Sequence, residues 1–191
     1  MMLEAFAVST GAVAVSEIGD KTQLLALVLA ARFRRPWPIV AGILVATLAN
    51  HAAAAALGAW LQGLLGPATM RWLLGGSFIA VALWMLIPDK VDEDDAGARV
   101  RGLGVFGITV IAFFLAEMGD KTQIATVMLA AKYGSLVAVT AGTTLGMMLA
   151  NVPAVLLGER AVRFVPLAVV HRVAAALFAL LGVLVLAGVG T

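Results

Sequence analysis

Long apolar stretches alternate with short polar segments along the whole chain. Six stretches contain the roughly 20 apolar residues that an α-helix needs to cross a bilayer. Because backbone polar groups in lipid must be hydrogen-bonded within the protein, each stretch is predicted to be a helix. The expected spans are residues 5–31, 39–61, 69–88, 103–131, 136–158 and 168–189. The pattern therefore predicts an all-α integral membrane protein with six transmembrane helices.

The composition agrees with a membrane protein and excludes several other classes. Hydrophobic residues make up 62% of the 191 residues and charged residues 13%, against roughly 25% charged residues in soluble domains. The chain has no cysteine, which excludes disulfides and thiolate metal sites. Its first residues lack the basic segment of a cleavable signal peptide. We expect a lipid bilayer around the protein and no nucleic-acid partner.

Basic residues are concentrated on one side of the predicted spans. Most Lys and Arg residues lie in or beside the loops after the first, third and fifth spans, whereas Arg71 and Lys132 lie on the other side. By the positive-inside rule these loops are cytoplasmic, so both termini are expected outside. Residues 91–101, which include the acidic run 92–95, are then a cytoplasmic linker.

The two halves of the chain align without a gap at an offset of 100 residues. Glu-Ile-Gly-Asp-Lys-Thr-Gln at residues 17–23 lies over Glu-Met-Gly-Asp-Lys-Thr-Gln at residues 117–123. Since each half has an odd number of spans, the second half must enter the membrane from the opposite face. We therefore expect residues 1–90 and 102–191 to be two inverted three-helix repeats, with a substrate site near the midplane where they meet. Other identities at this offset are Gly42 with Gly142 and Phe78 with Phe178.

Each repeat carries two carboxylates near the middle of its first span, Glu17 with Asp20 and Glu117 with Asp120. Ionisable groups at that depth cost about 2.5–3.5 kcal/mol each on insertion scales, so they should face the protein interior or a water-filled cavity. Residues three positions apart share one face of a continuous helix. The spacing therefore predicts that the two carboxylates of a motif converge on one point.

Neutral polar side chains follow each acidic pair. Their hydroxyl and amide oxygens belong to Thr22, Gln23, Thr122 and Gln123. A site of carboxylate, hydroxyl and amide oxygens, without cysteine or clustered histidine, suits hard divalent cations such as manganese, calcium and magnesium. Gly19 and Gly119 permit a close approach of backbone, or a local break that frees carbonyl oxygens. These residues are the candidate metal site, and no resident cofactor is expected.

A lysine adds positive charge to each motif. Lys21 and Lys121 follow the motif glutamates by four positions, so each is expected to form an ion pair with Glu17 or Glu117 on its own helix. Such a pair would lower the free-energy cost of inserting the charged motif into the membrane. Four carboxylates and two ammoniums leave a formal charge of −2. One divalent cation or two protons would neutralise that charge. The motifs therefore predict metal–proton exchange.

Other polar residues within the spans are given structural roles. Asn50 and Asn151 are expected to form hydrogen bonds between helices. His51 and His171 are isolated in the sequence and are not expected to form a ligand pair. The small-xxx-small run that begins at Gly142 is expected to be a helix contact.

Two copies of Glu-x-Gly-Asp-Lys-Thr, each in the first span of a three-helix repeat, resemble the motifs of the GDT-one family, also called uncharacterised protein family 0016. The resemblance covers nearly the whole chain. It implies a six-helix transporter: eukaryotic members are Golgi manganese and calcium transporters thought to exchange cations for protons, and bacterial members are mainly manganese exporters. It implicates Glu17, Gly19, Asp20, Lys21 and Thr22, with Glu117, Gly119, Asp120, Lys121 and Thr122.

The short central loop and the lack of a targeting extension look bacterial. The resemblance therefore implies a protein of the bacterial inner (plasma) membrane that exports manganese in exchange for protons. A calcium/proton antiporter of the same family is one alternative, and an exporter of an organic solute such as an amino acid is another. An intramembrane phosphatase would need arginine within the spans, and here the arginines lie in or near loops, so no enzyme is expected. One shared site and two successive sites both remain open, and so does the oligomeric state.

Overall fold

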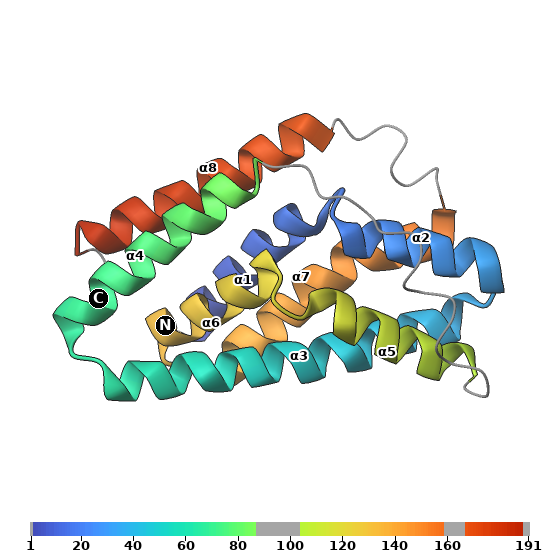
Figure 1. Ribbon diagram of the computed structural model, residues 1–191, viewed down its shortest axis with the longest axis horizontal. Helices are drawn as coiled ribbons and strands as arrows, with labels where there is room; N and C mark the ends of the chain where they lie inside the picture. Colours follow the sequence, from blue (N-terminus) through green and yellow to red (C-terminus); the bar gives the residue numbers. More distant parts are fainter. Residues whose placement is uncertain (1, 87–103, 159–166, 189–191) are drawn as a thin grey trace.

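The computed structural model describes residues 2–86, 104–158 and 167–188, and every regular element in these ranges is a helix (Figure 1). The first half contains α1 (Met2–Glu17), α2 (Lys21–Phe33), α3 (Pro36–Leu64) and α4 (Pro67–Trp84). The second half contains α5 (Val105–Glu117), α6 (Lys121–Tyr133), α7 (Leu136–Leu157) and α8 (Leu167–Leu186). The all-α prediction is confirmed, while the linker at 91–101 lies outside the described residues.

Some of these helices are long enough to cross a bilayer unaided. By length and composition, α3, α7 and α8 each qualify, and α1 with α2 qualifies as one broken span bent by 67°. The apolar helices α4 and α5 are shorter. The described residues therefore provide three membrane spans, or four when the bent pair counts as one.

The prediction of continuous helices over residues 5–31 and 103–131 is wrong, because each stretch is broken at its acidic motif. The first stretch breaks between α1 and α2, and the second breaks at the equivalent position between α5 and α6. Gly19 and Gly119 have φ angles of 83° and 74°. This left-handed region is open to glycine and unfavourable for other residues, so the glycine ends the helix. Apolar residues continue past the break on both sides, which is why hydropathy alone did not reveal it.

Helix contacts in one half reappear in the other at the offset of 100 residues. Helix α7 packs on α1, and α3 packs on α5. A Cβ atom added to Gly142 would lie 2.6 Å from the carbonyl oxygen of Phe6, and one added to Gly42 would lie 3.0 Å from that of Phe106. Both pairs of positions match at the offset. The predicted glycine contact at Gly142 is confirmed, and its equivalent in α3 packs in the same way.

Helices α4 and α8 pack side by side, as the green and red helices of Figure 1 show. The fully buried rings of Phe78 and Phe178, which match at the offset, have centroids 6.1 Å apart. Helix α8 also packs on α1, and α4 on α6. Each half therefore completes the core of the other, and the described helices form one body.

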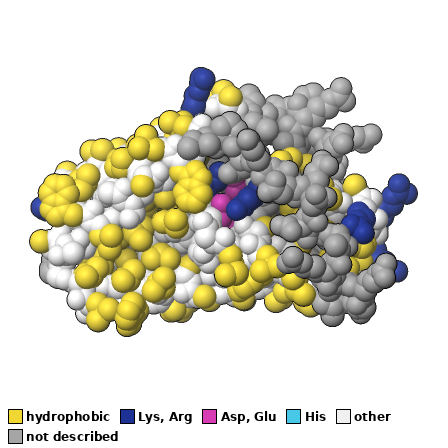
Figure 2. Space-filling model, viewed as in Figure 1, with side chains coloured by type: hydrophobic (Ala, Val, Ile, Leu, Met, Phe, Trp, Pro, Cys, Tyr) yellow, Lys and Arg dark blue, Asp and Glu magenta, His cyan; other side chains and the backbone are white. Residues whose placement is uncertain are grey.

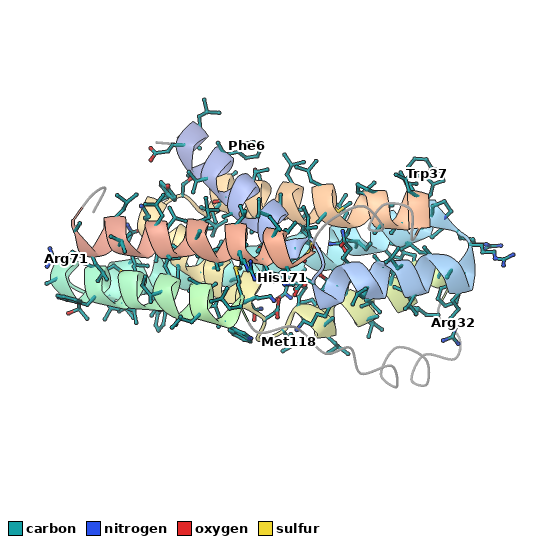
Figure 3. The ribbon with its side chains drawn as sticks, turned by 90° about the horizontal axis from the view of Figure 1, so that it is seen from above. Phe6, Arg32, Trp37, Arg71, Met118 and His171 are labelled. Carbon is teal, nitrogen blue, oxygen red and sulfur yellow. The ribbon has the colours of Figure 1, made fainter. Side chains whose placement is uncertain are left out.

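The outer surface is apolar, as lipid contact requires. Trp37 is 72% exposed and Trp72 is 63% exposed, together with many leucines and valines. Figure 2 shows hydrophobic side chains spread over the described part of one face. Figure 3 places Arg32 and Trp37 at one end of the molecule and Arg71 at the other. A surface of this kind, on helices of this length, belongs to a membrane protein.

The contact between α1 and α7 predicts a specific effect of adding one methyl group. A Cβ at Gly146 would lie 2.6 Å from the carbonyl oxygen of Thr10, whereas one at Gly11 of α1 would meet nothing within 4 Å. We expect Gly146→Ala to destabilise the fold by about 1–3 kcal/mol through overpacking. Gly11→Ala should be neutral, or stabilising by up to about 1 kcal/mol. Thermal unfolding in detergent, followed by tryptophan fluorescence, checks this; equal melting temperatures would contradict the contact.

Candidate metal centre

The two helix breaks bring the motif side chains into the interior. Glu17 is the last residue of α1, and Asp20 stands at the N-cap of α2 with extended backbone (φ −77°, ψ 167°). Glu117 and Asp120 occupy the same places, and Asp120 has nearly the same angles (φ −80°, ψ 162°). Neither aspartate side chain caps its own helix. Each instead contacts a lysine of the opposite half.

Two ion pairs cross between the halves. Lys21 Nζ lies 3.0 Å from Asp120 Oδ1, and Lys121 Nζ lies 2.8 Å from Asp20 Oδ1. The prediction that each lysine pairs with the glutamate four positions earlier on its own helix is wrong. Because the helix ends at the glutamate, the lysine begins a new helix with another direction. The exchange of partners ties the two motifs to each other.

The motif glutamines hold the breaks in place. Gln23 Oε1 accepts a hydrogen bond of 2.8 Å from the backbone N–H of Gly19, and its Nε2 donates to the carbonyl of Ala150 in α7 at 2.9 Å. Gln123 repeats this: its Oε1 accepts from the equivalent glycine N–H at 2.8 Å, and its Nε2 donates to Asn50 Oδ1 in α3. The amide oxygens predicted as metal ligands are therefore already engaged in satisfying backbone groups that the breaks expose.

Three carboxylates gather at one point between the halves. One oxygen from each of Glu17, Asp20 and Asp120 lies within 4.8 Å of the others, and all three residues are buried. Oxygen ligands at roughly 2.0–2.6 Å from a hard cation are at most about 5 Å apart, so one ion can contact all three. The cluster combines both halves, since Asp120 belongs to the second motif.

Both motif threonines donate hydrogen bonds to the carboxylate of Glu17. Thr22 Oγ1 donates to Glu17 Oε2 at 2.6 Å, and Thr122 Oγ1 donates to the other carboxylate oxygen. Glu17 is fully buried, so these two hydroxyls orient it. The predicted threonines are thus at the site, where they position a carboxylate.

Glu117 does not share the surroundings of its counterpart, Glu17. It is fully buried, neither of its oxygens has a hydrogen-bond partner among the described residues, and it is not part of the three-carboxylate group. Its Oε2 lies 3.9 Å from Nε2 of His51 in α3. His51 is isolated in the sequence, and its proximity to Glu117 was not predicted. The available signal was a titratable residue within a span, at the position where the other repeat has Asn151.

The two asparagines differ in role. Asn50 accepts the bond from Gln123 and its Nδ2 lies 3.5 Å from the carbonyl oxygen of Phe114 in α5, so its predicted interhelical role is confirmed. Asn151 Nδ2 donates to the carbonyl of Met147 in its own helix at 3.1 Å. Among the described residues Asn151 forms no hydrogen bond to another helix, so its predicted interhelical role is wrong.

The centre lies close to one face of the molecule. The side chain of Lys21 is 29% exposed, whereas those of Lys121 and the aspartates are at most 2% exposed. On the face that Figure 2 shows, acidic and basic side chains are visible together at one place, beside hydrophobic side chains. A buried, oxygen-lined acidic centre between broken membrane helices is typical of a membrane transporter for cations.

The chain belongs to the GDT1 family, described as divalent cation/proton antiporters. The family model matches residues 5–93 and 105–190, one segment in each half. A protein named "Putative manganese exporter" from Vibrio cholerae serotype O1 is 49% identical over 181 residues, covering 94% of this chain and 89% of that protein. A GDT1-like protein of Synechocystis is 30% identical over 183 residues, covering 83% of this chain and 84% of that one. These names describe transporters rather than enzymes. No solved structure matches the chain significantly.

The crossed ion pairs predict unequal effects of removing the two lysines. Lys121 is buried, so Lys121→Met should cost about 3–5 kcal/mol, as breaking buried ion pairs does. Lys21→Met should cost less because water reaches that side chain. Melting temperatures in detergent measure both. Adding Asp20→Asn to Lys121→Met should recover stability, and a double variant less stable than Lys121→Met would contradict the pairing.

Proposed function

We propose that this protein is a secondary transporter that exports manganese across the bacterial inner membrane in exchange for protons. The observation that carries the proposal is the approach of three buried carboxylates from both halves to within 4.8 Å. Membership of the GDT1 family supplies the class, exchange of a divalent cation for protons. The name of the Vibrio cholerae relative supports manganese as the cation.

Glu17, Asp20 and Asp120 are the proposed ligands of the transported ion. Thr22 and Thr122 fix the orientation of Glu17 and remain close enough to add hydroxyl oxygens. The remaining predicted site residues act around these ligands: Glu117 adjoins the cluster, Gln23 and Gln123 brace the breaks that Gly19 and Gly119 create, and Lys21 and Lys121 join the halves. All ligand atoms are oxygens, which suits manganese.

Charge balance links metal to protons. The four motif carboxylates and two lysines carry a formal charge of −2, which has to be compensated inside a membrane. A single Mn²⁺ compensates it when the transporter is loaded. Two protons compensate it on the return step, so the carboxylates exchange metal for protons without leaving a buried charge. The resulting stoichiometry is two protons for each metal ion.

The same geometry bears on the rival substrates. An exported amino acid would need a cation for its carboxylate, but both motif lysines are already paired with aspartates. Calcium is held by oxygen ligands, so the cluster would also accept it, although calcium takes roughly 6–8 ligands. We therefore place manganese first and calcium second.

Six membrane spans in two inverted repeats are the proposed architecture. Each broken pair, α1 with α2 and α5 with α6, counts as one span, and α3, α4, α7 and α8 supply the others. The twice-occurring helix contacts and the meeting of Phe78 with Phe178 support a two-fold relation between the halves. The distribution of basic residues supports an orientation with the termini outside and the central linker in the cytoplasm.

Inversion predicts that equivalent loop positions lie on opposite sides of the membrane. Arg35 and Ser135 are the N-cap residues of α3 and α7, and the chain has no native cysteine. In intact bacteria, a membrane-impermeant maleimide should label Ser135→Cys directly. It should label Arg35→Cys only after permeabilisation. Labelling of both from the same side would disprove the inverted repeat.

The transport activity is tested with purified protein in liposomes that contain a pH-sensitive dye. We expect manganese flux with opposing proton movement, reduced roughly 10-fold or more by Glu17→Gln, since ligand and near-ligand changes have effects of this size. Glu4→Gln, an exposed acidic residue of α1, is the matched control and should transport normally. Manganese flux without proton movement would refute exchange. Absence of flux for both manganese and calcium in folded protein would refute the function.

A further inference from the structure

His51 and Glu117 form a second polar group beside the carboxylate cluster. Both side chains are fully buried, and none of their four polar atoms has a hydrogen-bond partner among the described residues. Buried polar atoms are nearly always satisfied by protein, water or an ion. All four polar atoms of these two adjacent side chains are therefore available to bind a ligand.

The separation of the two side chains fits a bridging ion better than a direct bond. His51 Nε2 and Glu117 Oε2 are 3.9 Å apart. A direct hydrogen bond needs roughly 2.7–3.2 Å between the two atoms. Imidazole nitrogen and carboxylate oxygen bind a transition metal at about 2.0–2.2 Å each, so one ion between them allows up to about 4.3 Å. The pair is thus spaced for ligation.

This pair has no counterpart in the other half. The residue equivalent to Glu117 is Glu17, which receives both threonine hydroxyls. The residue equivalent to His51 is Asn151, which donates to the carbonyl of Met147 in its own helix. The fold repeats but the histidine does not, so only one of the two motif glutamates, Glu117, has an imidazole beside it. Glu117 belongs to the same helix break as Asp120 of the cluster, since the backbone N–H of Asp120 donates to the carbonyl of Glu117 at 3.2 Å.

We propose that His51 and Glu117 form a second cation subsite, and that its imidazole makes the transporter prefer first-row transition metals such as Mn²⁺ over Ca²⁺ and Mg²⁺. Calcium and magnesium take oxygen ligands, whereas transition-metal ions also bind imidazole nitrogen. The three-carboxylate cluster holds any hard divalent cation, and the adjacent subsite discriminates among them. This subsite rests on the proposed function, since it deepens the choice of substrate for the same centre.

Manganese electron paramagnetic resonance on the purified full-length protein tests the subsite without relying on transport. Electron spin echo modulation detects ¹⁴N bound to Mn²⁺, and competition with Ca²⁺ gives the relative affinity. The variants are His51→Asn, which has the residue of the other repeat, and His51→Gln, in case one of them misfolds. His171→Asn removes the other histidine and is the matched control.

The wild type and His171→Asn should show nitrogen modulation, and the His51 variants should lose it. Loss of the imidazole should weaken Mn²⁺ binding roughly 10-fold or more while changing Ca²⁺ binding much less. Nitrogen modulation that persists in a folded His51 variant, or an unchanged ratio of Mn²⁺ to Ca²⁺ affinity, overturns the subsite and leaves the proposed transport function standing. A wild type that binds no Mn²⁺ overturns both.

Discussion

Opposite charges buried in a membrane protein have to lie next to each other, and here the partner of each motif lysine comes from the other half of the chain. Lys21 meets Asp120, and Lys121 meets Asp20. Neither half can neutralise its own motif in this way, so the two motifs assemble only when the halves meet in one register. The repeated contacts of α7 on α1 and of α3 on α5 maintain that register.

The helix breaks convert two apolar spans into a binding centre. Ending each helix at its glutamate turns the following aspartate toward the opposite half, and the glutamines satisfy the exposed glycine N–H groups. Two threonine hydroxyls and two glutamates could be shared evenly, yet both hydroxyls bond to Glu17. Glu117 is then left facing His51. A nearly symmetric fold therefore holds an asymmetric centre, with oxygen ligands at one place and a nitrogen donor beside it.

Much of this could be predicted from the sequence, because lipid constrains it strongly. The apolar stretches predicted the helices, and the offset of 100 residues identified the motif residues. The small-xxx-small spacing predicted the glycine contact at Gly142. The pairing of each lysine with an aspartate of the other half could not be predicted, because the i to i+4 rule for Lys21 assumes a helix that continues through Gly19. The proximity of His51 to Glu117 could not be predicted either, because it depends on how α3 packs against α5. Spacing along one helix carries no information about such contacts.

The central claim is that one metal ion is held jointly by both halves. Anomalous diffraction from crystals grown with Mn²⁺, recorded at the manganese absorption edge, tests it most directly. The account predicts a peak within bonding distance of carboxylate oxygens of Glu17, Asp20 and Asp120. A principal peak held by the carboxylates of one motif alone, or the absence of a peak between the halves, would contradict it.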